Sequence, residues 1–237
     1  MDFQAGEVLY INKPLHWTSF DVVNKIRILL RNHFDIRKIK VGHAGTLDPL
    51  ASGMVIVCTG RATKRIEEFM GLEKEYMATI KFGETTPSFD LETTVDGVFP
   101  FEHITLAQLD QVLKEKFIGD IEQIPPIFSA VKFNGKRAYD FAREGQEVEL
   151  KSRKVSVYSI VVESFELPYV VLRIRCGKGT YIRSLARDLG VSLQSGGHLV
   201  KLVRTRIGEW TLRESVFMAE LGGIFERLKG MNNVPQE

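Results

Sequence analysis

Cysteine is scarce in this chain, with only two among 237 residues. Both lie in apolar, strand-like runs, so we expect buried thiols in a reducing compartment rather than a disulfide framework. The five histidines show no metal-ligand spacing with one another or with the cysteines, and the chain has neither a P-loop nor a dinucleotide-binding fingerprint. An enzyme with this sequence is therefore expected to work without a metal or an organic cofactor.

Long apolar runs are also missing. The sequence has no stretch of about 18 apolar residues and no N-terminal pattern of a secretory leader. Its hydrophobic content of 44% and charged content of 26% are ordinary for a globular protein. We expect a cytoplasmic protein without a membrane partner, long enough for one large domain with a small appendage.

The net charge of +2 by itself excludes no class of binding partner, but the charged residues are unevenly distributed along the chain. Residues 1–65 carry +5, residues 66–120 carry −8 and residues 121–210 carry +6. Two basic segments that flank an acidic one are typical of a protein with one face that meets phosphates, although chance clustering of solvated charges would give the same numbers.

Strand and helix patterns are intermixed along the chain. The β-rich runs at 155–162 and 170–176 favour a long antiparallel pair, whereas Thr18 and Thr180 are typical helix N-caps. A last helix, interrupted by Gly222-Gly223, is predicted over 216–229. Because strict β-α-β alternation is absent, the pattern predicts an α+β fold with a large, mainly antiparallel sheet flanked by helices and loops.

The most informative segment is Val41-Gly-His-Ala-Gly-Thr-Leu-Asp-Pro-Leu-Ala-Ser-Gly53, which combines three glycines with one histidine and one carboxylate. Pro49 fixes its own φ and biases Asp48 toward an extended or turn conformation. A buried strand is predicted directly afterwards, at 54–58. Asp48 is then either a single acid presented on a stiff functional loop or part of an Asp-Pro turn that caps a strand.

The part from His43 to Gly53 closely resembles the signature loop of the TruB family, bacterial synthases that make pseudouridine in the T-loop of tRNA. The resemblance covers roughly residues 8–210 and implies the pseudouridine synthase fold. It implies that Asp48 is the essential catalytic residue. It also implies that His43 stacks among the T-loop bases and supports base flipping, without acid or base chemistry.

The segment Cys176-Gly-Lys-Gly-Thr-Tyr-Ile-Arg183 joins a predicted strand to a helix start. A cation in the first turn opposes the helix dipole, so Arg183 either has an acid or phosphate nearby or is an ordinary surface arginine. In the TruB family the arginine of this motif forms a salt bridge with the catalytic aspartate. The resemblance therefore implies that Arg183 pairs with Asp48, keeping the acid ionised and aimed.

Three further positions gain a role from the resemblance. Tyr76, by itself typical of a core aromatic, would stack on the target base and assist proton removal. Leu202, by itself typical of a core, would pack against the flipped base. Lys13 belongs to a match with the family's N-terminal motif Lys-Pro-x-Gly-x-Thr-Ser, in which His16 occupies the usual glycine position. If that position needs a positive φ, His16 is strained or the turn differs.

The stretch Lys132-Phe-Asn-Gly-Lys-Arg-Ala-Tyr139 resembles another family motif. It mixes basic and aromatic residues as an RNA-contacting surface does, although a solvated helix start would look similar. A looser match at 83–90 lacks the family's usual trailing glycine. With His43, the expected RNA-binding residues are Lys64, Lys132, Lys136, Arg137, Tyr139, Lys178 and Arg204.

The resemblance implies a catalytic domain over residues 1–210 and a short helical tail over 211–237. Longer family members carry a C-terminal PUA domain that binds RNA, and the 27 residues after Trp210 are too few for one. The expected partner is the T-arm of tRNA. Neither a protein partner nor an oligomer is implied, so a monomer is expected.

Uridine becomes pseudouridine when its N1–C1′ bond breaks, the base turns and C5 joins C1′, which needs no cofactor. The predicted function is this isomerisation at the T-loop uridine, position 55 of tRNA, after the base has flipped out of its stack. An alternative is a noncatalytic tRNA-binding or folding factor on the same scaffold. A nucleoside hydrolase would need a second acid or a metal cluster, and an RNA-guided relative would need the PUA domain.

Overall fold

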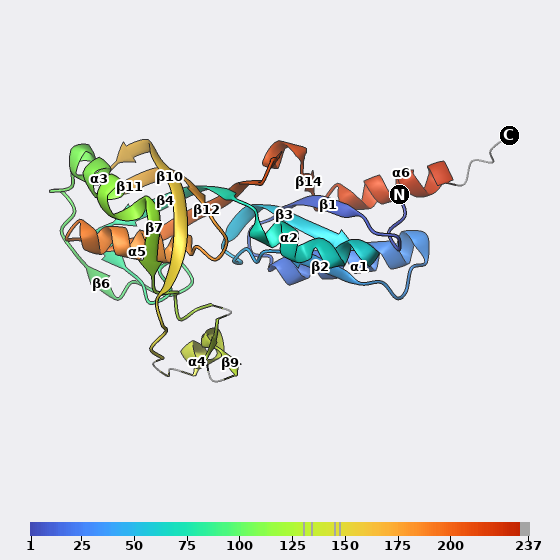
Figure 1. Cartoon of the computed structure of the whole chain (residues 1–237), viewed down its shortest axis with the longest axis horizontal. Helices are drawn as coiled ribbons and strands as arrows, with labels where there is room; N and C mark the ends of the chain where they lie inside the picture. Colours follow the sequence, from blue (N-terminus) through green and yellow to red (C-terminus); the bar gives the residue numbers. More distant parts are fainter. Residues whose placement is uncertain (130, 134, 145, 147, 233–237) are drawn as a thin grey trace. The chain divides into compact units, whose positions relative to one another are not determined.

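The computed structural model describes residues 1–129, 131–133, 135–144, 146 and 148–232. The chain forms two compact units. Unit 1 comprises Met1–Lys74 and Val203–Glu237, and unit 2 comprises Glu75–Leu202. Strands β4 (Lys74–Phe82) and β12 (Gly197–Ile207) carry the chain from one unit to the other (Figure 1).

Unit 1 combines strands with helices from both ends of the chain. Besides the end of β12, its elements are β1 (Val8–Lys13), α1 (Ser19–Phe34), β2 (Val41–Ala44), β3 (Ala51–Thr59), the 3₁₀ turn η1 (Gly60–Arg65), α2 (Ile66–Gly71), β13 (Trp210–Thr211), the 3₁₀ turn η3 (Leu212–Glu214), β14 (Val216–Phe217) and α6 (Leu221–Asn232).

Strand β3 is the centre of unit 1. It pairs antiparallel with β1, from Lys13↔Gly53 to Val8↔Cys58, and with β2. Strand β14 adds to the other edge of β1 in parallel. Eight of the nine residues of β3 are buried, as expected of a strand that is covered on both faces.

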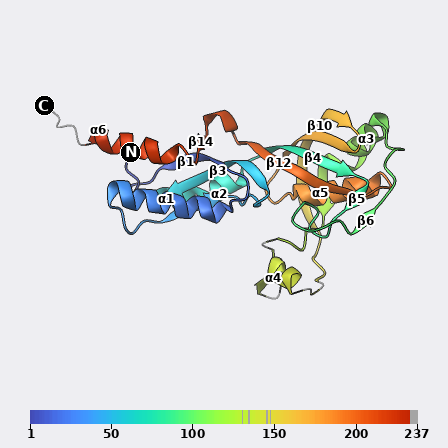
Figure 2. The same ribbon diagram turned by 180° about the vertical axis from the view of Figure 1, so that it is seen from behind.

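Helix α1 begins at a capping box, as the N-cap pattern predicts. Thr18 Oγ1 accepts a hydrogen bond from the Asp21 N–H at 3.0 Å, and the Asp21 carboxylate accepts one from the Thr18 N–H at 2.8 Å. Helix α6 packs beside α1 in both views (Figure 1, Figure 2). Between them the rings of Phe3, Phe34 and Phe225 lie 5.2 to 5.6 Å apart, so the two chain ends share one aromatic core.

Unit 2 contains most of the remaining strands. Besides β4 and β12, its elements are β5 (Glu84–Thr85), β6 (Gly97–Val98), α3 (Leu106–Val112), the π turn η2 (Leu113–Phe117), β7 (Gly119–Gln123), β8 (Lys132–Phe133), β9 (Lys136–Arg137), α4 (Ala138–Arg143), β10 (Arg153–Glu166), β11 (Tyr169–Cys176) and α5 (Ile182–Ser192).

The predicted long antiparallel pair is confirmed as β10 and β11, which pair from Val157↔Cys176 to Glu166↔Tyr169. Strand β7 pairs with β10, again antiparallel. Burial alternates along β4 and β11, the pattern of a sheet with one covered face. Helix α4 lies apart from this sheet in both views (Figure 1, Figure 2).

The fold is α+β with a mixed, mainly antiparallel sheet, as the sequence predicts. A last helix is present, but its start predicted at Val216 is wrong, and it runs through Gly222 and Gly223 without the predicted interruption. Val216 and Phe217 pair with Ile11 and Asn12 of β1, and the helix begins only at Leu221. Strand pairing overrides the local helical pattern here. Within the described ranges, no helix is both long and apolar enough to cross a membrane.

Candidate active site

The predicted catalytic loop is the turn between β2 and β3. Gly45 enters it with φ of +94°, a conformation that glycine adopts without steric cost. Ser19 Oγ of α1 accepts a hydrogen bond from the Leu47 N–H at 2.9 Å and donates to the Leu47 carbonyl at 3.3 Å. The Asp48 carbonyl accepts a hydrogen bond from the Ala51 N–H at 3.0 Å. Asp48 is therefore presented, half-buried, on a turn that is fixed on both sides.

Arg204 of β12 holds the loop from within unit 1. Its side chain is buried, and its Nε donates to the Met54 carbonyl at 2.7 Å. Its two other guanidinium nitrogens donate to the carbonyls of Gly45, at 3.2 Å, and Thr46, at 3.4 Å. Gly53 permits this approach, because a Cβ there would lie 2.4 Å from the Arg204 carbonyl oxygen. The RNA contact predicted for Arg204 would require its guanidinium to leave these carbonyls.

Lys13 is fully buried beneath the N-terminal turn. Its Nζ donates to the Trp17 carbonyl at 2.5 Å and to the Pro14 carbonyl at 3.0 Å. Burial lowers the pKa of Lys13 to about 8, against the opposing influence of the Asp48 carboxylate and with a smaller lowering by Arg204. Lys13 is consequently still mainly a cation at neutral pH, and its charge offsets that of Asp48.

His43 lies half-buried in β2, immediately before the loop. Burial is the main cause that lowers the pKa of His43, and the positive charge of Arg204 lowers it further. Its Nδ1 is buried, and a backbone contact with Gly45 raises the pKa against these two effects. A neutral imidazole at pH 7 agrees with the expected stacking role better than with a cationic one.

His16 adopts a φ of +65°, the left-handed conformation that the usual glycine of this motif implies. Its N–H donates to the carbonyl of Pro49 at 2.8 Å. The N-terminal motif is thereby linked to the residue that follows Asp48. A non-glycine residue at this φ stores about 1 kcal/mol of strain, and the strain lies directly beside the turn that presents Asp48.

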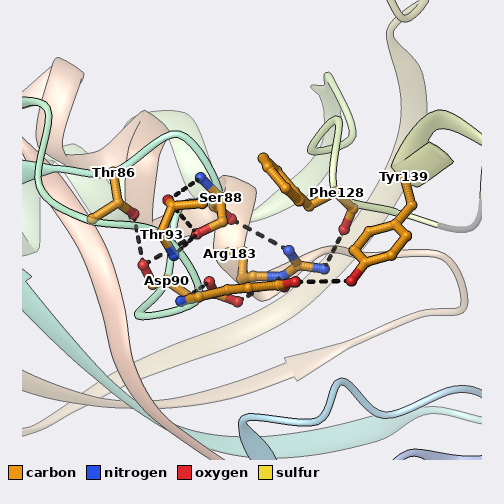
Figure 3. A network of polar contacts seen from close by, with 8 residues as sticks. Thr86, Ser88, Asp90, Thr93, Phe128, Tyr139 and Arg183 are labelled. Carbon is orange, nitrogen blue, oxygen red and sulfur yellow. Dashed lines mark hydrogen bonds and ion pairs between the residues drawn. The ribbon is translucent and has the colours of Figure 1, made fainter. Parts of the chain in front are cut away.

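In unit 2, Arg183 lies at the centre of a polar network (Figure 3). The residue is only 3% exposed, so its guanidinium depends on protein groups for hydrogen bonds. Its Nε lies 3.5 Å from Asp90 Oδ2. One terminal nitrogen donates to the Phe128 carbonyl at 2.9 Å, and the other donates to the Ser88 carbonyl at 3.3 Å. Arg183 is therefore not an ordinary surface arginine.

Asp90 ends the looser family match at 83–90, and the sequence reasoning gave it no role. It lies in a tight turn in which Thr86 Oγ1 donates to its carbonyl at 2.7 Å and Ser88 Oγ donates to the same oxygen at 3.2 Å. The Asp90 Oδ1 accepts a hydrogen bond from the Glu92 N–H at 2.9 Å. The available signal was a carboxylate at the end of a run of small hydroxyl residues, which tend to form such turns.

The N-cap predicted at Thr180 is wrong by one residue. Helix α5 begins at Ile182 with Tyr181 as its N-cap, and no side chain of the cap itself closes the first turn. Gln123 of β7 takes this place, because its side-chain oxygen accepts from the Tyr181 N–H at 2.8 Å and its amide nitrogen donates to the Tyr181 carbonyl at 3.0 Å. Thr180 Oγ1 instead donates to the Gly177 carbonyl at 3.1 Å.

Tyr76 and Leu202 are buried in β4 and β12, as their core-like patterns predict. These two residues and Arg183 belong to unit 2, whereas Asp48 belongs to unit 1. Their roles at the target base, and the pairing of Arg183 with Asp48, stay predictions.

The residues predicted to bind RNA differ in exposure. Lys64, Lys136 and Lys178 are exposed. Tyr139 is half-buried, donates to Glu92 Oε1 at 3.1 Å and packs edge-on against the Phe128 ring, which places it in the Arg183 network of Figure 3. The side chains of Lys132 and Arg137 lie outside the described part of the structure.

Residues 31–182 match the model for the TruB family pseudouridylate synthase (N terminal domain). The chain belongs to the TruB family. This TruB chain is 58% identical to tRNA pseudouridine synthase B of Parabacteroides distasonis over 227 residues, which cover 96% of each chain. It is 56% identical to the protein of the same name from Phocaeicola vulgatus over 214 residues, which cover 90% of this chain and 91% of that protein.

A solved structure has the same fold as this TruB chain. It is described as the crystal structure of a Cbf5-Nop10-Gar1 complex, and the aligned chain is 30% identical with a TM-score of 0.73. The alignment covers 98% of the TruB chain and 58% of the solved one, so this chain spans less than two thirds of that relative's length.

Proposed function

We propose that this TruB-family chain isomerises uridine to pseudouridine in the T-loop of tRNA, at position 55. The observation that carries the proposal is the position of Asp48: one carboxylate on a turn held by Ser19 and Arg204, within the loop that matches the family signature. Membership of a family of pseudouridylate synthases supports the same chemistry.

The reaction is balanced within the substrate. The N1–C1′ bond breaks, the base turns, a C5–C1′ bond forms, C5 loses a proton and N1 gains one. Asp48 is proposed to serve as nucleophile at C1′, as base toward the ribose or as electrostatic support for a sugar cation. In each role it must be fixed in place, and its charge acts on the buried Lys13, whose pKa it raises against the lowering by burial.

The other residues hold the base and the loop. We assign Tyr76 and Leu202 to contacts with the flipped base, Arg183 to an ion pair with Asp48, and His43 to stacking that keeps the nucleotide outside its helix. Flipping costs a few kcal/mol, which stacking and phosphate contacts must offset. The proposed catalytic unit is residues 1–210, with 211–237 as a helical tail.

Release of tritium from an unmodified tRNA transcript labelled at uridine C5 tests the proposal. The unaltered chain is expected to release tritium, and Asp48→Asn is expected to bind the transcript without release. Asp110→Asn on α3 is the matched control and should behave as the unaltered chain does. Binding without release by the unaltered chain would overturn the proposal in favour of a noncatalytic tRNA-binding factor.

A further inference from the structure

Gln123, the last residue of β7, is bonded to the backbone at the start of α5. The residue is only 1% exposed. Its side-chain oxygen accepts a hydrogen bond from the Tyr181 N–H at 2.8 Å, and its amide nitrogen donates to the Tyr181 carbonyl at 3.0 Å. An ionised carboxylate would lack the donor, so the neutral amide is what satisfies both backbone groups of one residue at once. Both residues belong to unit 2.

The Tyr181 carbonyl also closes the first turn of α5, because it accepts a backbone hydrogen bond from the N–H four positions later, at 3.1 Å. Arg183 lies within that turn. The next residue, Ser184, is fully buried, and its Oγ donates to the Ile124 carbonyl at 2.8 Å. The end of β7 and the residue after it therefore hold α5 on both sides of Arg183.

The guanidinium of Arg183 depends on this fixed backbone. Its contacts, to the carbonyls of Ser88 and Phe128 and to the Asp90 carboxylate, come from two other segments of unit 2 (Figure 3). The donors of a guanidinium are arranged in a rigid planar fork, so they satisfy several partners only in one orientation. A shift of the first turn of α5 would move the fork relative to all three partners together.

We propose that Gln123 is a positioning residue for the isomerisation, because it fixes the Tyr181 backbone and thereby sets the direction of the Arg183 guanidinium. The inference rests on the proposed function, in which that guanidinium pairs with Asp48. We assign Gln123 no contact with RNA. Loss of its two bonds should consequently lower kcat, whereas tRNA binding should hardly change.

Two substitutions separate the bonds of Gln123 from its volume. Gln123→Met keeps the length of the side chain and removes both bonds. Gln123→Glu keeps the acceptor for the Tyr181 N–H, but it donates to the Tyr181 carbonyl only when the new carboxyl is protonated. Burial raises the pKa of a carboxyl, so lower pH favours this protonated form. The glutamate variant is therefore expected to regain activity as the pH falls.

Gln108 provides the matched control, because its side chain caps another helix of unit 2. Its Oε1 accepts a hydrogen bond from the Thr105 N–H at 2.9 Å, at the start of α3, a helix that carries none of the residues assigned to the reaction. Gln108→Met therefore removes a helix cap of the same residue type. Circular dichroism verifies that each variant is folded at the assay temperature before its activity is compared.

Tritium release and tRNA binding are measured for the unaltered chain and each variant. In Gln123→Met we expect kcat to fall about ten- to a hundredfold while Kd for tRNA changes by less than about twofold. Gln108→Met should change neither constant by more than about twofold. A folded Gln123→Met chain with unchanged kcat, or an equal loss of kcat in the Gln108→Met control, would overturn the proposal.

Gln123→Glu keeps the proposal testable if Gln123→Met does not fold. The ratio of its kcat to that of the unaltered chain should rise as the pH falls from ~9 to ~6, because protonation restores the second bond. Gln108→Glu, which keeps its acceptor in either form, should give a constant ratio. A ratio that stays near one for Gln123→Glu over the whole range would overturn the proposal, since the second bond would then have no effect on the reaction.

The position of the Arg183 side chain is also measured without turnover. In a chain whose arginines carry an isotopic nitrogen label, the Nε–H resonance of Arg183 is assigned by its absence from Arg183→Lys. Gln123→Met should shift or broaden this resonance, and Gln108→Met should leave it in place. An unmoved resonance in Gln123→Met would overturn the proposal. If the unaltered chain released no tritium, the proposed function would fail, and the resonance would still decide whether Gln123 positions Arg183.

Discussion

Arg183 and Asp90 form a buried ion pair, with the Arg183 Nε 3.5 Å from Asp90 Oδ2 and side chains that are only 4% and 7% exposed. The pair joins the first turn of α5 to the turn that follows β5. An arginine in a first helical turn is opposed by the helix dipole, and this carboxylate offsets that cost. The other two guanidinium contacts, to Ser88 and Phe128, fix the direction in which the side chain points.

Asp90→Ala should lower the free energy of unfolding by about 1–3 kcal/mol, because it removes a buried carboxylate beside the Arg183 guanidinium and the acceptor of the Glu92 N–H. Urea titration followed by circular dichroism measures the change. Asp96→Ala, at an exposed carboxylate that bonds Thr85, is the matched control and should cost less than about 1 kcal/mol. Equal losses in the two variants would contradict a buried role for the pair.

Arg204→Lys separates a loop-holding role from an RNA contact. A lysine cannot replace three donors that reach the carbonyls of Met54, Gly45 and Thr46. We expect kcat for tritium release to fall at least tenfold, while Kd for tRNA changes about twofold or less. A rise in Kd as large as the fall in kcat would restore the direct RNA contact that the sequence suggests.

His16→Gly should raise the free energy of unfolding by about 0.5–1 kcal/mol, because glycine adopts a φ of +65° without a Cβ clash. His16→Val should lower it by more than about 1 kcal/mol, since a β-branched residue tolerates this conformation least. Thermal unfolding of the unaltered chain and the two variants gives their order of stability. A loss of stability in His16→Gly would mean that the imidazole makes a contact worth more than the strain.

Lys13 makes stability depend on pH, because its pKa falls from 10.5 in the unfolded chain to about 8 in the folded one. Below pH 8 both forms are protonated, and the folded chain bears the whole cost of the buried cation, about 3 kcal/mol. Between pH 8 and 10.5 the unfolded chain holds more protons, so stability rises with pH by up to about 1.4 kcal/mol per unit.

Lys13→Met removes this titration. The difference in unfolding free energy between the unaltered chain and Lys13→Met should therefore shift in favour of the unaltered chain as the pH rises from about 7 to about 10. Urea titrations at several pH values in this range measure the difference. A difference that stays constant over this pH range would show that burial does not lower the pKa of Lys13.

Local signals made much of unit 1 predictable. Thr18 and Asp21 lie three residues apart, so their capping box is visible in the sequence. The glycines and Pro49 of the Asp48 loop likewise set the backbone conformation at their own positions, so their effect can be predicted from the sequence. The bonds that hold this loop were not visible, because Ser19 and Arg204 reach it from elements distant in sequence.

The errors in unit 2 have the same origin. Thr180 has the composition of an N-cap, but Gln123, 58 positions earlier, bonds the backbone of Tyr181 and fixes the helix start one residue later. Asp90 shows no helical or strand pattern, and its partner is 93 positions away. A single sequence gives no sign of such a pair. The pair matters for stability because it is buried, where charges interact more strongly than in water.

The bond from Arg204 to the Gly45 carbonyl spans 159 positions of the chain. During synthesis, the segment that contains Asp48 leaves the ribosome long before Arg204 is made. The turn around Asp48 in a nascent chain therefore lacks one of its holding side chains until residue 204 has been made. Fragments that end before residue 204 are therefore expected to have an unfinished turn around Asp48, and this turn reaches its final geometry only after β12 has been made.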